Sequence, residues 1–176
     1  MIRIVRKPMV HFEKLEIDNT GAIDAMSKMA TEIVREHFDP LIGKEQNDYM
    51  ISLFQTPEAI SSQLQKGYQY WFACLDDAKI GFLAYYEKPH AMYLSKFYLY
   101  RKYRGRGYAQ KMLDFVIQKA EKAGFDAIEL NVNRDNDAVK IYKAMGFEVI
   151  REEKNDIGSG FSMDDYVMSK RIREEI

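Results

Sequence analysis

The chain has 176 residues, of which 47% are hydrophobic and 30% are charged, and its formal net charge is −1. These values fit one soluble globular domain, because two domains would each be too small for a sizeable core. A near-neutral chain is no general binder of polyanions, so any attraction for phosphate must be local. The single cysteine excludes an internal disulfide and a cysteine-built metal site. Because no apolar run reaches membrane-spanning length and no signal-peptide core is present, we expect a cytoplasmic protein that binds neither nucleic acid nor membrane.

The first 69 residues carry one strand pattern and three helix patterns. Alternating apolar and charged residues predict the strand, and N-cap residues before an apolar stripe predict the first helix. Asp39-Pro40 ends that helix, since the residue before a proline is disfavoured in the helical region. Thr56-Pro57 opens the third helix as an N-cap with proline at the first helical position. The predicted elements are a strand at 2–6 and helices at 20–38, 49–54 and 57–67.

Residues 70–170 predict a sheet interleaved with two helices. Asp76-Asp77 joins the first two strands in a tight hairpin. Both helices show apolar residues at i, i+3, i+4 and i+7 and end at a glycine. The predicted strands span 70–75, 79–86, 92–100, 127–132, 147–153 and 161–170, and the predicted helices span 109–123 and 138–145. Without a linker or an internal repeat, a single α/β domain with a mixed sheet fits best.

A cationic glycine loop connects the strand at 92–100 to the helix that begins near Ala109. A strand, a loop with little side-chain bulk and a helix start together make an anion site, because unpaired amides and the helix dipole point at the ligand. Four cationic side chains add to the positive charge, namely Arg101, Lys102, Arg104 and Arg106. The loop therefore predicts a pyrophosphate cradle. The plainer interpretation is that the glycines form an ordinary turn between a strand and a helix, and that the charged side chains are exposed to solvent.

Two motifs carry a resemblance to a known family. Arg104-Gly105-Arg106-Gly107-Tyr108-Ala109 is similar to the Arg/Gln-x-x-Gly-x-Gly/Ala signature of the GNAT acetyltransferase superfamily. One helix and one strand later, the second motif follows as Leu130-x-Val132, Asn136-x-Ala138, Tyr142 and Met145-Gly146-Phe147. The resemblance covers residues 70–170, and residues 1–69 resemble the family only in the order of their elements. The two-helix insert and the ending Asp164-Asp165-Tyr166-Val167-Met168 look most like bacterial polyamine and diamine acetyltransferases.

The resemblance implies a single-domain GNAT-like α/β fold. Its central sheet is mixed, mostly antiparallel and twisted, is flanked by helices, and splays apart between the strands at 92–100 and 127–132. Residues 70–170 would bind acetyl-CoA and residues 1–69 would form the acceptor side. The implied activity is N-acetyl transfer from acetyl-CoA to a primary amine of a small molecule, with a polyamine as the suggested acceptor, by direct attack in a ternary complex without a metal. Exposed strand edges near the C-terminus suggest a homodimer.

The resemblance also assigns roles to individual residues. The cosubstrate pyrophosphate would be held by the backbone amides of Arg104, Gly105, Arg106, Gly107, Tyr108 and Ala109. The backbone of Leu99 would pair with the pantetheine arm, and its N–H would polarise the thioester carbonyl. Asn136 would line the CoA cleft, or serve only as a helix cap. Tyr142 would protonate the departing thiolate as a general acid, since a phenol is protonated at pH 7, whereas the plainer role is that of a core residue.

The general base is the point at which the chain departs from the family pattern. Many members carry a glutamate four residues before the position of Leu99, and this chain has Ser95 there. A base is needed because an amine with a pKa near 10.4 is almost wholly protonated at pH 7. Position alone suggests Glu32, Glu36, His37 and His90, each of which is also an ordinary surface residue.

Features of the sequence also suggest three other functions. A dinucleotide-binding fold needs a third glycine where Gln110 stands, and an acidic residue at the end of the next strand, where Asn131 and Asn133 stand. A nucleic-acid module needs a longer basic patch than residues 98–108 offer. The remaining alternative is an acyl-CoA sensor of the same fold without turnover: the absent carboxylate favours it, and the retained Tyr142 argues against it.

Overall fold

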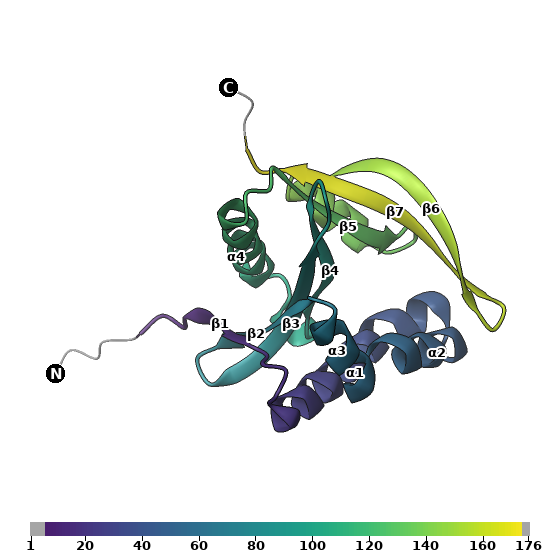
Figure 1. Ribbon diagram of the computed structural model, residues 1–176, viewed down its shortest axis with the longest axis horizontal. Helices are drawn as coiled ribbons and strands as arrows, with labels where there is room; N and C mark the ends of the chain where they lie inside the picture. The colour runs from purple at the N-terminus through teal and green to yellow at the C-terminus, as the bar shows by residue number, and fades with distance from the viewer. Residues whose placement is uncertain (1–5, 174–176) are drawn as a thin grey trace.

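A twisted sheet of seven strands runs through the molecule (Figure 1). The computed structural model describes residues 6–173. In chain order the elements are β1 (Val10–Lys14), α1 (Thr20–Ile42), α2 (Lys44–Phe54), α3 (Pro57–Gln65), β2 (Gln69–Leu75), β3 (Ala78–Glu87), β4 (Met92–Leu99), a short 3-10 helix (Arg101–Tyr103), α4 (Tyr108–Lys122), β5 (Ala127–Asn133), α5 (Ala138–Ala144), β6 (Glu148–Gly158) and β7 (Phe161–Arg171). The strand order is β1-β2-β3-β4-β5-β7-β6, and only the β4–β5 pair is parallel. The mixed, mostly antiparallel α/β fold predicted from the sequence is confirmed.

The N-terminal part corrects two predictions. Residues 2–5 of the first predicted strand lie outside the described residues, and the first strand that the structure describes is β1, which the sequence analysis missed. The predicted helix end at Asp39-Pro40 is wrong, because α1 continues through Pro40 to Ile42. Proline has no N–H for the carbonyl one turn earlier, that of Glu36. The guanidinium of Arg101 donates to this carbonyl at 2.9 Å instead, which removes much of the cost of the proline.

Helices cover both faces of the sheet (Figure 1). On one face, α4 packs its buried stripe of Met112, Leu113 and Val116 against the central strands. On the other face, α1 and α3 pack against β2 and β3 in a second apolar cluster. β4 lies between these two layers, with Leu94 in the first cluster and Tyr98 packed against the second. Within the described part of the chain, no helix is long and apolar enough to cross a membrane.

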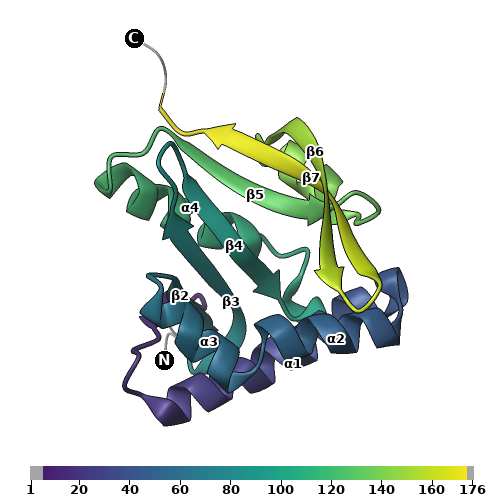
Figure 2. The ribbon, with the colours of Figure 1, turned by 45° about the vertical axis from the view of Figure 1, so that its right-hand side comes forward.

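The sheet splays between β4 and β5, as predicted. Pairing between them is limited to Met92 with Ile128 and Tyr93 with Glu129. Figure 2 shows the two strands starting together and diverging toward their C-terminal ends. A bulge lies just beyond the last paired residue, because Ser95 has no partner while its neighbours pair with β3. Bulges increase the local twist of a strand, which turns the rest of β4 away from β5.

The β6–β7 hairpin extends over the N-terminal helices, toward α2 (Figure 2). The hydroxyl of Tyr49 on α2 donates to the carbonyl of Ile157 at 2.8 Å, and the amide of Gln46 donates to that of Ser162 at 3.0 Å. The predicted closing pair of strands is confirmed and is longer than expected, with β6 reaching Gly158. The hairpin and α2 therefore enclose a space on the α1 side of the splayed strands.

Candidate active site

A cavity of about 980 Å³ passes through the gap between β4 and β5. At one end it is lined by Gly105, Gly107 and Ala109, at the start of α4. At the other end it opens into a chamber, here called the acceptor chamber, whose lining includes Tyr68, Tyr86, Tyr93, Lys96 and Asp165. One continuous space therefore connects the predicted pyrophosphate cradle to the N-terminal helices.

Five of the six amides of the predicted cradle, those of residues 105–109, have no partner among the described residues; the sixth, that of Arg104, donates to the carbonyl of Arg101 at 3.1 Å. No hydrogen bond within the described residues involves the N–H groups of residues 105–110, and the first helical bond of α4 runs from Lys111 to Gly107 at 3.4 Å. Gly105 and Gly107 have φ values of +75° and +84°, which glycine adopts without strain. Unlike α1 and α3, which asparagine and threonine side chains cap, α4 has no side-chain cap. Six consecutive free donors and the helix dipole suit a diphosphate.

Two of the four cationic side chains expected at this loop are bound elsewhere. The Arg101 guanidinium donates to the carbonyl of Glu36, as described above. The guanidinium of Arg104 donates to the carbonyl of Leu99 through Nε at 3.3 Å and Nη2 at 3.1 Å. These two arginines therefore fix the end of β4 against α1 and the loop, and the attraction for an anion comes mainly from the backbone.

The backbone of Leu99 faces the gap. Tyr100 donates its N–H to the carbonyl of Ile80 on β3 at 3.0 Å, and strand residues alternate in the direction of their amides. The N–H and carbonyl of Leu99 consequently point away from β3, toward the space that β5 has left. The carbonyl is already bound by Arg104, so the N–H is the group available to a ligand in the cavity.

Tyr142 on α5 packs against the α4-side core and also lines the cavity. The ring lies 5.7 Å from Phe147 and 6.2 Å from Phe97, centroid to centroid. No hydrogen bond of the hydroxyl is found among the described residues, although Tyr142 lines the cavity. Burial raises the pKa of this phenol, with a contribution from Tyr98, so it stays protonated at neutral pH. The same desolvation raises the pKa of a thiol in this space.

Asn136 lies at the cavity and directly before the N-cap of α5, which is Asp137. It is buried and lines the cavity, and its Oδ1 accepts from the N–H of Ala138 at 2.9 Å, at the start of α5. The same oxygen lies 3.1 Å from Nε2 of His37. Nδ1 of His37 lies 3.3 Å from Nη1 of Arg104. Because a guanidinium only donates, Nδ1 must accept and Nε2 must carry the proton.

None of the four predicted base candidates is a free base in the cavity. His37 lines it, but its one lone pair accepts from Arg104, and burial together with Arg104 lowers its pKa. Glu32 accepts from the Tyr100 hydroxyl at 2.6 Å, and Glu36 accepts from the amide of Arg101 at 3.0 Å. His90 lies before the start of β4, at the end away from Leu99, where it contacts Glu129 at 3.2 Å.

The structure adds two charged residues that the sequence analysis did not consider for the chemistry. Asp165 on β7 and Lys96 on β4 are 3% and 6% exposed, and both line the acceptor chamber. Nζ of Lys96 donates to the Phe54 carbonyl at 2.8 Å, to Gln55 Oε1 at 2.9 Å and to the Tyr70 hydroxyl. Burial lowers the pKa of Lys96 to about 7. From the sequence, both residues could have been identified as charged residues at strand positions that face the interior.

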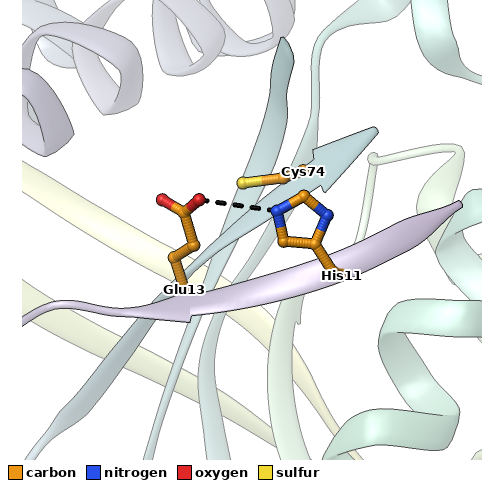
Figure 3. A group of neighbouring side chains, drawn as sticks. All are labelled: His11, Glu13 and Cys74. Atoms are coloured by element: carbon orange, nitrogen blue, oxygen red, sulfur yellow. Dashed lines mark hydrogen bonds and ion pairs between the residues drawn. The ribbon is translucent and has the colours of Figure 1, made fainter. Parts of the chain in front are cut away.

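One further cluster lies at the β1 edge (Figure 3). His11 pairs with Cys74 across β1 and β2, and Nε2 of His11 lies 3.4 Å from Oε1 of Glu13. These three residues could each offer a ligand atom to a metal. However, burial and Glu13 raise the pKa of the Cys74 thiol to about 11, and thiolate is the form that binds metals. The expectation that the chain uses no metal stays a prediction.

The fold and the cavity define a class of protein. A splayed sheet leaves a free strand edge beside a cradle of unpaired amides, which suits a cosubstrate with a diphosphate and an extended arm. The model of the acetyltransferase (GNAT) domain matches residues 39–168. The chain therefore belongs to the GNAT acetyltransferase family, a family of acetyl-CoA-dependent N-acetyltransferases.

Individual relatives agree with this assignment. N-alpha-acetyltransferase 50 from Danio rerio is 38% identical over 73 residues, which are 40% of this chain and 44% of that protein, so the match spans less than half of this curated relative. The PaiA N-acetyltransferase from Thermoplasma acidophilum, solved in complex with coenzyme A, has a TM-score of 0.73 and 21% identity over 93% of this chain and 99% of that one. A GNAT family acetyltransferase from Elizabethkingia anophelis with acetyl-CoA bound has a TM-score of 0.63 and 13% identity over 92% of this chain and 97% of that one.

Proposed function

We propose that this protein transfers the acetyl group of acetyl-CoA to a primary amine of a small molecule, by direct attack in a ternary complex. The free amides of residues 105–109 hold the pyrophosphate, whereas the N–H of Arg104 is bound to the carbonyl of Arg101, and Asn136 lines the cleft. The N–H of Leu99 binds the thioester oxygen as negative charge develops on it. Tyr142 protonates the departing thiolate. As part of the same proposal, the protein works in the cytoplasm; its single thiol, Cys74, is free and buried.

One observation carries this proposal. A single cavity is lined by the loop of free amides at the start of α4, by Leu99, by Tyr142 and by the residues of the acceptor chamber. A cosubstrate that enters from the cradle and an amine that enters from the chamber would meet in the gap between β4 and β5. Such a meeting favours direct transfer, because holding both reactants in one site replaces an encounter in solution.

The lining of the acceptor chamber favours a cationic acceptor, with a polyamine or diamine as the class that fits best. The rings of Tyr68 and Tyr86 stack at 4.4 Å, and those of Tyr86 and Tyr93 lie at 5.0 Å. Tyrosine faces attract ammonium groups. The carboxylate of Asp165 lies in the same lining. Lys96 does not make the chamber a site for anions, because its three hydrogen bonds are to neutral acceptors and leave it no free donor.

The alternative is a sensor that binds acyl-CoA without turnover, which the serine at position 95 favours. Coenzyme A binding measured by calorimetry, together with thiol release from acetyl-CoA in the presence of an amine panel, separates the two. The panel contains butylamine, 1,4-diaminobutane, spermidine, glucosamine and a tetrapeptide with a free N-terminus. We expect binding and the fastest release with 1,4-diaminobutane or spermidine. Binding with no release from any amine would leave the sensor, and no binding would refute both.

A further inference from the structure

The acceptor chamber holds a carboxylate whose hydrogen-bonding capacity is largely unused. Oδ2 of Asp165 accepts one long bond, of 3.4 Å, from Nδ2 of Asn131, and no other hydrogen bond of this side chain is found among the described residues. A carboxylate has about four acceptor sites. Asn131 is itself held by the hydroxyl of Tyr93, which donates to its Oδ1 at 2.8 Å. Asp165 is therefore positioned by its neighbours while most of its lone pairs stay available to a ligand.

Asp165 lies on the α1 side of the sheet, beside the C-terminal end of β5. Met168 on the same strand packs in the α4-side core, and strand side chains alternate between faces, so Asp165 faces the chamber on the α1 side. It pairs in register with Asn133, the last residue of β5. Burial, with a contribution from the charge of Asp165, raises the pKa of Tyr98 to about 12, and both residues line the cavity. Leu99, the predicted oxyanion donor, follows Tyr98 directly.

The other ionisable groups near the chamber are already engaged. Glu153 on β6 accepts from Nε of Arg151 at 3.0 Å and from Asn131 at 3.2 Å, bonds that lower its pKa. Nζ of Lys96 is saturated by three neutral acceptors. His37 has no free lone pair. Among the groups considered, Asp165 alone combines a buried position in the cavity lining with free acceptor capacity.

We propose, on the basis of the proposed function, that Asp165 binds the ammonium group of the acceptor and takes its proton, the role for which Ser95 provides no carboxylate. The freed amine forms a C–N bond with the thioester carbon, and the electrons of the C–S bond leave with the sulfur. Tyr142 gives its proton to the thiolate and recovers one from the new ammonium nitrogen. Asp165 then releases its proton to solvent, so that an ammonium ion and acetyl-CoA become an amide, coenzyme A and one proton.

The surroundings of Asp165 suit this exchange. Burial, together with the charges of Glu153 and of its neighbour Asp164, raises the pKa of Asp165, against the bond from Asn131. The phenols of Tyr93 and Tyr98 face it in neutral form, because the pKa of each is raised. Among the described residues, the cavity lining contains three Lys or Arg side chains. Burial lowers the pKa of Lys96 to about 7, and the guanidinium groups of Arg101 and Arg104 donate to backbone carbonyls. Outside the lining, Nζ of Lys88 lies 4.0 Å from the centroid of the Tyr93 ring. An arriving ammonium group would relieve the isolated negative charge, and a carboxyl with a raised pKa is a better proton acceptor at neutral pH.

The decisive variant is Asp165→Asn, which keeps the shape and removes the charge. Its matched control is Asp164→Asn, the same change one residue earlier, on the opposite face of β7. Asp164 lies outside the cavity lining and forms an ion pair with Arg134 at 3.0 Å. With 1,4-diaminobutane at pH 7 we expect Asp165→Asn to lose about 10²-fold to 10⁴-fold in kcat/KM, the usual contribution of a general base, while Asp164→Asn stays within about threefold.

The loss of kcat/KM in Asp165→Asn should depend on whether the acceptor amine is protonated. With 2,2,2-trifluoroethylamine, which is neutral at pH 7, the ratio of wild-type to Asp165→Asn activity should fall toward one, and it should also fall for 1,4-diaminobutane as the pH approaches 10. A merely structural role would give a constant ratio, which would overturn the proposal. Asp165→Glu should recover part of the activity. Coenzyme A affinity should be equal in all variants, since Asp165 lies beyond the cradle.

A binding measurement separates this inference from the proposed function. Calorimetric titration of 1,4-diaminobutane into the coenzyme A complex should show binding that Asp165→Asn weakens at least tenfold and Asp164→Asn does not. If the wild type binds the diamine in this way but never turns over, the ammonium site stands, and the transfer function and the proton transfer fail. If the diamine does not bind, or binds both variants equally, the inference is overturned whatever the enzyme assay shows.

Discussion

Replacing Tyr142 by phenylalanine tests the assignment of the general acid with an effect that can be separated from stability. The ring contacts with Phe97 and Phe147 at 6.2 and 5.7 Å remain in the variant. The hydroxyl has no hydrogen-bond partner among the described residues, so its removal breaks no bond. A satisfied buried hydroxyl would cost about 0.5–1.5 kcal/mol when removed. We therefore expect the free energy of unfolding to change by less than about 0.5 kcal/mol.

Catalysis should respond quite differently. General acids contribute about 10²-fold to 10⁴-fold, and each tenfold corresponds to about 1.4 kcal/mol of activation free energy, so kcat should fall by an amount equivalent to about 3–5 kcal/mol. Coenzyme A affinity should stay near that of the wild type. Thiol release, calorimetry and urea unfolding measure the three quantities. Tyr166→Phe is the matched control, because Tyr166 is also partly buried against the α4-side core and lies outside the cavity lining. Unchanged turnover in Tyr142→Phe would show that the residue only packs.

Three other changes test separate parts of the structure. Gly107→Glu should abolish coenzyme A binding in calorimetry, whereas Gly107→Ala, which carries the same strain at φ +84° without the charge, should retain measurable affinity; equal loss in both would mean that backbone strain dominates. The pKa of Lys96 is about 10.5 in the unfolded chain and about 7 in the folded protein. Between these two values the unfolded state binds more protons, so the contribution of Lys96 to the free energy of unfolding should rise with pH from 7 to 10. The difference in thermal midpoint between wild type and Lys96→Met should grow over that range, and a flat difference would contradict the shift. Treatment with EDTA should leave turnover unchanged, because the proposed mechanism uses no metal; a loss of turnover that added metal restores would contradict this.

Elements that depend on neighbours in the sequence could be predicted. The apolar stripe of α4, the threonine cap of α3 and the two-residue turn at Asp76-Asp77 are each decided within one helical turn or one hairpin. The unpaired amides of residues 105–110 follow from a local pattern of the same kind, because a glycine loop between a strand and a helix leaves its amides unpaired where the helix has no side-chain cap. These local patterns fix most of the fold and the cosubstrate end of the site.

Features that depend on contacts between distant segments could not be predicted. The helix continues through Pro40 because Arg101, 65 residues after Glu36, binds the carbonyl that the proline leaves free. The two arginines that the loop appeared to offer to an anion are used to hold α1 and Leu99. His37 looked like a candidate base until Arg104 was seen to occupy its lone pair. In each case the side chain is hydrogen-bonded to a partner that lies far away in the sequence.

The position of Ser95 connects these observations. A bulge leaves this residue unpaired, and β4 separates from β5 immediately before it. Were the two strands paired along their full length, the N–H of Leu99 would bond to β5 and no acyl group could reach it. The hydroxyl of Ser95 cannot accept a proton at neutral pH, so this position contributes backbone geometry, and the proton acceptor must come from another element. The splay that frees Leu99 also admits β7 to the edge of the gap, where Asp165 lies, with Tyr98 interacting electrostatically with both Asp165 and Tyr142. The same bulge thus explains why Leu99 on β4 has a free N–H while the proposed proton acceptor, Asp165, lies on β7.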